Sequence, residues 1–438
     1  MLTLKLIICK MIQNILKKIG RGTSLPGEIA LKLDKDILKK LELPKTTICV
    51  TGTTGKTSIS GTLTEIYKNA GLKVGSNSKG SNLKAGVTSV ILDSVNIFGK
   101  TKVDVLVLET DERYVKEVFK DFKPNYFVIN NLSRDQLARN GHFDIVFDDI
   151  KMRITKDIHL VLNADDPLVM KFSLGHKGKI SYYGLAKTKY STKKNTSKLD
   201  MMYCPVCHKK LEFDYFHYAN LGNYHCPNND FNRPDNLYEA KLNNDNTFTL
   251  DGNKIKMNND ALYNIYNLSA SYVVAKNSGI NTSSIVETLN NLSLKIKRLD
   301  TFKIGKKEGV ILLSKNDTPI SYNQSIDYVK KQTGDKTIFL GFNVISGRYN
   351  IKDLSWLYDV NFELLKDDSI KKIFCFGRFA NDVALRLKYA DIDTKKVEVI
   401  EDSSLILETF KTKSKGITYL IFPFDLEHVL RDQLSEVE

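Results

Sequence analysis

One short segment limits the folds open to this chain more than any other: the loop TGTTGKTS at residues 51–58. It follows an apolar run at residues 46–50 that is typical of a buried strand, and it precedes residues 58–70, whose spacing is helical. A strand–loop–helix unit of this kind brings backbone N–H groups, a lysine and a hydroxyl around phosphate groups. The loop is a shorter variant of the usual one, because Val50 stands where the first glycine would be. We predict that it holds the phosphates of ATP through Gly52, Thr53, Thr54, Gly55, Lys56, Thr57 and Ser58.

Further apolar runs alternate with helical stretches on the C-terminal side of this loop. Residues 103–108, 126–129 and 159–162 are short and rich in β-branched or aromatic residues, as strands of a buried parallel sheet are. Residues 266–278 have helical spacing and end at a glycine. The alternation predicts an α/β fold whose central domain has a doubly wound, mostly parallel sheet.

The 438 residues favour more than one domain, and the pattern changes at three places. We expect a lead-in segment at 1–45, an ATP-binding domain at 46–300 and a Rossmann-like α/β domain at 301–438. A polar, cysteine-bearing stretch at 187–236 interrupts the second of these as a small ribbon insertion. The strands expected in the last domain are residues 310–313, 337–340, 372–376, 397–400 and 419–422.

The lead-in segment contains apolar residues at roughly helical spacing over residues 2–19, interrupted by four lysines. Its apolar run is too short to span a bilayer. Such an amphipathic helix can lie on a membrane surface, but we expect it to pack on its own protein. The net charge of +14 favours anionic partners, and the absence of a dense basic block with aromatics speaks against nucleic acid. We expect a cytoplasmic enzyme that can touch the inner face of the membrane.

Three of the six cysteines lie close together in the insertion. Cys204 and Cys207 form one Cys-x-x-Cys knuckle, whereas the second knuckle starts at Cys226 and has Asn229 in place of its last cysteine. A structural zinc site needs four tetrahedral ligands. We expect these three cysteines to hold zinc with a fourth ligand from His208, His225, Asp230 or water, unless the ribbon has lost its metal.

An acidic turn, Glu109 to Glu112, follows the strand at 103–108. Carboxylates just beyond the end of a parallel strand face the crevice where ligands bind. We therefore predict that Glu109 binds Mg²⁺ together with the hydroxyl of Thr57. For Asp111 and Glu112, a solvated turn explains the sequence equally well.

Four motifs in this order resemble the Mur ligase family, the amino-acid ligases of peptidoglycan synthesis. They are TGTTGKT, the strand-end Glu109, NLxxDQ at residues 131–136 and LNADDP at residues 162–167. Folylpolyglutamate synthase shares the central architecture and is the nearest alternative. The resemblance implies that ATP activates a carboxylate as an acyl phosphate, and that Asn131, Asn264 and Arg298 lie in the nucleotide site.

Within that family the chain is most similar to a branch that amidates the D-glutamate of lipid II to D-isoglutamine, using ammonia from a separate glutaminase subunit. The similarity rests on RGTSLPGEIA (21–30), RDQLARNG (134–141), CPVC (204–207), LYNIYN (262–267) and DLSWLYDVNFE (353–363). It implies a glutaminase partner and lipid II as substrate. Gln136 replaces a metal-binding histidine of other members, and Lys151 lies near the place of their carbamylated lysine.

The resemblance gives Asp353 a particular role, since it matches the carboxylate that completes the Cys–His pair of the glutaminase. Trp356, the only tryptophan, would then suit an interface anchor. Two alternatives stay open: a stand-alone ligase that adds an amino acid, and a silent scaffold that binds nucleotide and a glutaminase. CPVC and DLSW argue against the first, and intact Lys56, Thr57 and Glu109 argue against the second.

Overall fold

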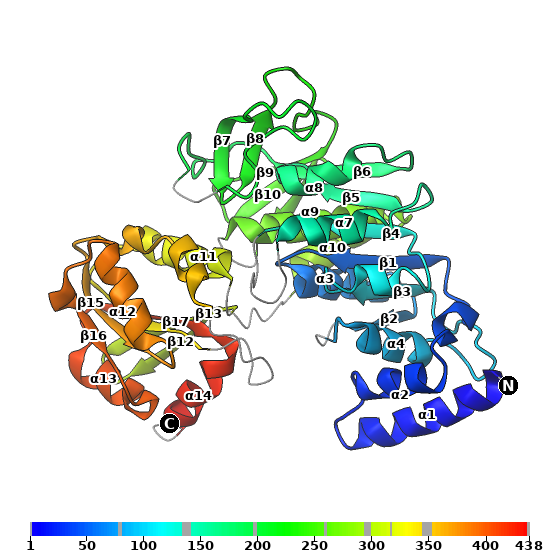
Figure 1. Cartoon of the computed structure of the whole chain (residues 1–438), viewed down its shortest axis with the longest axis horizontal. Helices are drawn as coiled ribbons and strands as arrows, with labels where there is room; N and C mark the ends of the chain where they lie inside the picture. Colours follow the sequence, from blue (N-terminus) through cyan, green and yellow to red (C-terminus); the bar gives the residue numbers. More distant parts are fainter. Residues whose placement is uncertain are drawn as a thin grey trace. The chain divides into compact units, whose positions relative to one another are not determined.

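The computed structural model describes residues 2–77, 81–133, 142–195, 199–257, 261–292, 299–315, 318–343 and 353–435. These residues form two compact units (Figure 1). Apart from His142, the described residues up to 292 make the first unit, and those from 299 to 435 make the second.

The first unit contains a nine-stranded sheet that confirms the predicted α/β class. Neighbouring strands in it pair in parallel except at one edge, where the last three strands pair antiparallel with one another. The four central parallel strands are buried over almost their whole length because helices cover both of their faces. In sheet order the strands are β11 (Asn253–Lys256), β10 (Thr247–Leu250), β9 (Tyr238–Leu242), β6 (Ile180–Leu185), β5 (His159–Asn163), β4 (Tyr126–Ile129), β1 (Thr46–Thr51), β3 (Val105–Glu109) and β2 (Val74–Ser76).

Helices cover the sheet as a doubly wound fold requires (Figure 1). On one face α3 (Lys56–Asn69), α9 (Leu262–Asn277) and α10 (Thr282–Asn291) pack against one another. Alternate strand residues such as Cys49 and Leu108 belong to a core shared with the other helices. Those helices are α4 (Lys84–Asp93), α5 (Val115–Val118), α7 (Phe143–Lys151) and α8 (Pro167–Met170).

The N-terminal segment folds as two helices, α1 (Leu2–Lys18) and α2 (Leu25–Leu33), which pack with α4. The Gln13 side chain donates to the carbonyl of Ser89 at 3.0 Å, and the Ser89 hydroxyl accepts from the N–H of Gly27 at 2.8 Å. An added Cβ at Gly27 would overlap the backbone of α4, so α2 approaches α4 as closely as glycine permits. The expected packing of α1 on its own protein is confirmed. In the described part of the chain, no helix combines the length and hydropathy that crossing a bilayer requires.

Between β6 and β9 the chain leaves the sheet and forms the antiparallel hairpin of β7 (Glu212–Tyr218) and β8 (Leu221–His225). Aromatic side chains fill the hairpin: the rings of Phe213 and Phe216 stack with their centroids 4.3 Å apart. The cysteine cluster lies in the loops on either side of this hairpin.

The second unit has a six-stranded sheet, parallel except for its first strand. In sheet order the strands are β12 (Leu299–Ile304), β13 (Lys307–Ser314), β17 (Ile417–Pro423), β14 (Lys336–Gly341), β15 (Ile370–Phe376) and β16 (Val397–Val399). Its helices include α11 (Pro319–Lys331), α12 (Ala380–Tyr389), α13 (Ile406–Lys413), α14 (Glu427–Ser435) and the 3-10 helices η3 (Ser355–Asp359) and η4 (Phe362–Leu365).

The interpretation of Trp356 as an exposed interface anchor is wrong. The indole is buried in the core of the second unit, where its centroid lies 5.5 Å from that of Tyr322 and 5.6 Å from that of Phe342. Burying a large aromatic surface against other rings stabilises the fold of this unit. The neighbouring Asp353 and Tyr358 remain exposed.

Candidate active site and metal site

The loops after β3, β1 and β4 meet at one edge of the first sheet. The register of the three strands brings these loops together, since Val50 pairs with Glu109 and Thr51 pairs with Ile129 across parallel strands. The carboxyl edge of such a sheet is where ligands bind in doubly wound folds. The glycine loop therefore lies between the acidic turn on one side and the asparagine pair that opens NLxxDQ on the other.

The glycine loop has a backbone that other residues adopt only with strain. Gly52 has φ +140° and Gly55, the N-cap of α3, has φ +85°. An added Cβ at Gly55 would overlap the side chains of Asn267 and Asn130. The first N–H groups of α3 have no partner inside the helix and form, with the helix dipole, a site suited to phosphate. Thr57 and Ser58 are exposed there.

Asparagines after β4 hold the loop in this conformation. The N–H of Thr53 donates to the carbonyl of Asn131 at 3.0 Å, and the N–H of Thr54 donates to its side-chain oxygen at 2.9 Å. Asn130 Nδ2 donates to the carbonyl of Thr54 at 3.1 Å. Through these contacts Asn131 holds the glycine loop in its conformation. Its direct contact with the nucleotide stays a prediction.

Asn130 and Asn267 are site residues that sequence reasoning missed. Asn130 Nδ2 also donates to Asn267 Oδ1 at 3.1 Å, and the Tyr183 hydroxyl donates to Asn130 Oδ1 at 2.8 Å. Asn267 closes the block LYNIYN, but only the packing of α9 on α3 brings it to Gly55.

Lys56 is buried and held among acceptors at the start of α3. Its Nζ donates to the carbonyl of Gly52 and to Glu112 Oε2, the latter at 2.9 Å. Burial acts to lower the pKa of Lys56, but the charges of Glu112 and Asp111 outweigh it and hold the pKa above its ordinary value. The alternative that Glu112 belongs to a solvated turn is wrong, since its carboxylate is buried against the ammonium group of Lys56. Asp111 pairs instead with Arg113 at 2.8 Å.

Glu109 has the arrangement expected of a metal carboxylate. Its Oε1 accepts from Asn82 at 2.9 Å, whereas its buried Oε2 has no hydrogen-bond partner among the described residues. Asn77 fixes the backbone of Glu109 from both sides, accepting from its N–H at 2.7 Å and donating to its carbonyl at 2.8 Å. A buried carboxylate oxygen left without a donor is a fit for a hard cation such as Mg²⁺.

The other predicted site residues differ in what the structure says of them. Asn264 lies on α9 with its Nδ2 buried and unpartnered among the described residues, so it is available to a ligand. Arg298 and Gln136 lie outside the described residues. The Lys151 ammonium donates to the carbonyls of Phe172 and Leu174 at 2.9 and 2.6 Å, which gives it a structural role.

The motif LNADDP ties the insertion to the main sheet. Arg233, at the end of the insertion, donates to Asp165 Oδ1 at 2.6 Å, and the hydroxyl of Tyr266 donates to Asp165 Oδ2 at 2.6 Å. All three side chains are buried, and removing one partner of a buried pair leaves an uncompensated charge. Asp166 caps α8 and also accepts from the N–H of Leu132 at 3.0 Å.

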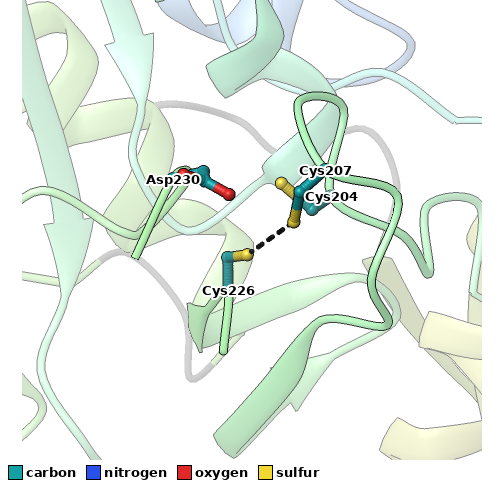
Figure 2. Close-up of side chains that lie close together, drawn as sticks. All are labelled: Cys204, Cys207, Cys226 and Asp230. Carbon is teal, nitrogen blue, oxygen red and sulfur yellow. Dashed lines mark hydrogen bonds between the residues drawn. The ribbon is translucent and has the colours of Figure 1, made fainter. Parts of the chain in front are cut away.

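Four ligand-type side chains converge beside the hairpin (Figure 2). The Sγ atoms of Cys204, Cys207 and Cys226 and a carboxylate oxygen of Asp230 all lie within 4.8 Å of one another. The N–H groups of Val206 and Asn228 each point at a cysteine Sγ at 3.4 Å, as donors that stabilise thiolates do.

The second knuckle explains why Asp230 and not Asn229 faces the cluster. In the first knuckle the positive φ falls on His208, four residues after Cys204; in the second it falls on Asn229, only three residues after Cys226. The tighter turn brings the next residue, Asp230, into the group. His225 instead contacts Glu212 at 3.3 Å.

Asp353 lies two residues before η3 begins and is exposed. Its Oδ1 accepts from the N–H of Ser355 at 2.8 Å, which fixes the direction of the carboxylate. One carboxylate oxygen of Asp353 thus accepts a hydrogen bond from the backbone, and the side chain is exposed at the surface of the second unit.

Two families match this chain. Residues 50–275 match the family described as Mur ligase middle domain, and residues 313–424 match the one described as MurT ligase C-terminal. The first covers more than half of the chain.

Relatives match over nearly the full length. The "Lipid II isoglutaminyl synthase (glutamine-hydrolyzing) subunit MurT" of Staphylococcus aureus is 33% identical over 94% of this chain and 93% of its own. The protein of the same description from Streptococcus pneumoniae is 30% identical over 99% and 97%. A pseudomurein peptide ligase type C from Methanothermus fervidus shares the fold, with a TM-score of 0.70 at 23% identity over 92% of this chain and 81% of that one.

Proposed function

The chain belongs to the Mur ligase family, in the branch of the MurT subunits, and we propose that it is the synthetase subunit of a lipid II isoglutaminyl synthase. As a member of this family it is an ATP-dependent ligase. The proposed substrate is the D-glutamate α-carboxylate of the lipid II stem peptide, and the proposed product is the D-isoglutamine amide.

One observation carries the proposal: Lys56 and the unpartnered oxygen of Glu109 both lie at the carboxyl edge of β1 and β3, beside the glycine loop. This arrangement suits phosphoryl transfer, in which positioning and charge stabilisation provide most of the catalysis. A silent scaffold would not need a buried lysine and an unpartnered carboxylate oxygen at the same edge.

The reaction proceeds in two steps. A carboxylate oxygen of D-glutamate attacks the γ-phosphorus of ATP, ADP leaves, and an acyl phosphate forms. The lone pair of ammonia then attacks the acyl carbon, inorganic phosphate leaves, and the nitrogen loses a proton to give the amide. Lys56 neutralises charge on the transferring phosphoryl group, and the N–H groups at the start of α3 orient it. Glu109 and Thr57 would hold Mg²⁺, which would supply further charge neutralisation when bound.

The chain alone is not expected to hydrolyse glutamine, because its cysteines are committed elsewhere. Cys9, Cys49 and Cys375 are buried in apolar cores, and the other three form the cluster at the hairpin. Burial raises the pKa of Cys49 and Cys375 to about 12, so neither is a ready nucleophile. We propose a glutaminase subunit as the source of ammonia, with Asp353 as the carboxylate that orients its catalytic histidine. Asn131, Asn264 and Arg298 remain proposed nucleotide contacts.

The test is reconstitution of the purified chain with a glutaminase from the same host, with detergent-solubilised lipid II and ATP. Mass spectrometry of the stem peptide should show conversion of acid to amide with either glutamine or an ammonium salt as nitrogen source. Incorporation of an amino acid would identify a stand-alone ligase. ATP binding without any product would identify a scaffold.

We also propose that Cys204, Cys207, Cys226 and Asp230 hold a structural zinc ion. The donor set fits, because three thiolates and one carboxylate are ligands zinc accepts in tetrahedral sites. The lobe also has an apolar core, in which the ring of Tyr224 lies against those of Phe213 and Phe231, and a bound metal would add to the folding free energy that this core supplies.

Asp230→Ala is expected to lower zinc occupancy, while Asp214→Asn, an exposed aspartate of β7 in the same hairpin, is expected to leave it unchanged. Elemental analysis of the purified protein measures the occupancy. Removal of the zinc by a chelator should lower the melting temperature by roughly 5 °C or more. Full occupancy in Asp230→Ala would show that water or another residue provides the fourth ligand. A chelated protein with an unchanged melting temperature would contradict the structural role.

A further inference from the structure

Helix α1 has two apolar faces, and only one of them packs on the protein. Leu6 and Cys9 are buried on the inner face, and Gln13 donates to the backbone of α4 from the same side. This face accounts for the contacts of α1 with α2 and α4.

The other face of α1 is exposed to solvent. Leu4, Ile8, Met11 and Ile15 recur at steps of four, three and four residues, which places them in one row along the helix. We name this row the α1 stripe. Leu4, Met11 and Ile15 are 64%, 61% and 60% exposed. A contiguous row of exposed apolar side chains on a globular domain is typical of an interaction surface.

The surroundings of the α1 stripe are positively charged. The first 27 residues contain four lysines and one arginine but no aspartate or glutamate. Ion pairs offset two of these five cations, Lys5 with Asp34 at 2.8 Å and Lys17 with Asp93 at 2.7 Å, so the segment keeps a positive excess. Lys18 and Arg21 are exposed at the C-terminal end of the helix.

A second apolar element lies at the other end of α1. The turn containing Phe98 approaches the helix start, because an added Cβ at Gly99 would come within 3.6 Å of Leu2. Phe98 is 66% exposed, and Ile97 beside it is exposed as well. Phenylalanine is one of the side chains that interfacial amphipathic helices bury at the boundary between headgroups and acyl chains.

We propose that the α1 stripe, with Phe98, docks on an anionic phospholipid surface and holds the first unit at the membrane that carries its substrate. The inference rests on the proposed function, since a lipid-linked substrate is met at a bilayer. Fluid acyl chains can pack around the exposed side chains of a single helix without a complementary surface. Anionic headgroups are attracted to the positive charges beside the α1 stripe. A second copy fits less well, because two stripes face to face would bring like charges together. The glutaminase is expected at Asp353, in the other unit.

Vesicle flotation tests this with the full chain. The wild-type chain is expected to float with vesicles of phosphatidylglycerol and phosphatidylcholine, and less with phosphatidylcholine alone. Met11→Gln/Ile15→Gln should weaken the binding to the mixed vesicles by at least about tenfold. The matched control is Ile145→Gln/Met152→Gln, which removes the same two side-chain types at 59% and 61% exposure from α7 and the turn after it. This control should float like wild type, and all variants should keep the wild-type melting temperature.

Several outcomes would overturn the proposal. The proposal would be wrong if the wild-type protein did not float with the vesicles. It would also be wrong if both double variants lost vesicle binding to the same extent. A dimer, seen by light scattering, that Met11→Gln/Ile15→Gln dissolves would identify a second copy instead. Loss of glutaminase binding in the same variant would identify that subunit.

Amidation of lipid II in detergent micelles separates this inference from the proposed function. Met11→Gln/Ile15→Gln should amidate micellar lipid II at the wild-type rate but amidate vesicle-embedded lipid II more slowly. An active enzyme that does not float defeats only the membrane proposal. A chain that floats but does not amidate lipid II in either form defeats the proposed function.

Discussion

Lys56→Ala is expected to lower ATP-dependent amidation by a factor on the order of 10³ or more, with glutamine or with ammonium salt alike. The lysine meets charge that develops on the transferring phosphoryl group, and no other described cation contacts the glycine loop. The measurement is amide formation on lipid II under saturating ATP.

The same substitution is expected to lower stability, because it leaves Glu112 buried without its partner. The free energy of unfolding should fall by about 3–5 kcal/mol, as it does when a buried pair loses one member. The double variant Lys56→Ala/Glu112→Gln should recover much of that stability but none of the activity. Lys68→Ala, which removes an exposed lysine from the same helix, is the matched control and should change neither property. Activity that returned with stability in the double variant would show that Lys56 acts only through folding.

Asp353→Asn is expected to abolish glutamine-dependent amidation and to spare amidation from ammonium salt. The loss should be about 10⁴-fold, as when the carboxylate of a catalytic triad becomes an amide and the histidine is left in the wrong tautomer. An asparagine keeps the oxygen that accepts from the N–H of Ser355, so η3 should keep its start and the complex should still assemble. Ammonia from solvent bypasses the glutaminase and reaches the ligase site directly.

Asp359→Asn, at the far end of the same 3-10 helix, is the matched control and should retain both activities. If it lost glutamine-dependent activity while Asp353→Asn did not, Asp359 would be the orienting carboxylate. Equal loss of both activities in Asp353→Asn would place the residue in the ligase reaction or in the fold, and would contradict the split site.

Much of this molecule could be predicted from local sequence pattern. The strand, glycine loop and helix at residues 46–69 follow from periodicity and from the residue types that phosphate binding needs. The family assignment, made from four motifs in order, is confirmed by relatives that match nearly the whole chain. Predicted strands such as residues 126–129 agree with the structure because parallel strands buried on both faces are distinctive in sequence.

What could not be predicted depends on long-range packing or on a single backbone turn. Asn130 and Asn267 are 137 residues apart, and only the packing of α9 on α3 brings them together. The place of Asp230 depends on one residue less in the turn after Cys226, which a ligand-spacing rule does not contain. Trp356 was misjudged, and the role of Glu112 stayed open, because burial within the chain decides both.

The meeting of Gly55, Asn130 and Asn267 also bears on how the protein is made. A nascent chain that has emerged only as far as β6 already contains the glycine loop, but it lacks the side chain from α9 that packs against Gly55. Closure of so long a segment is slow compared with local helix formation. Capacity to bind nucleotide should therefore arise late during translation, once α9 has left the ribosome. Until then, the incomplete glycine loop of the nascent chain would not bind cellular ATP.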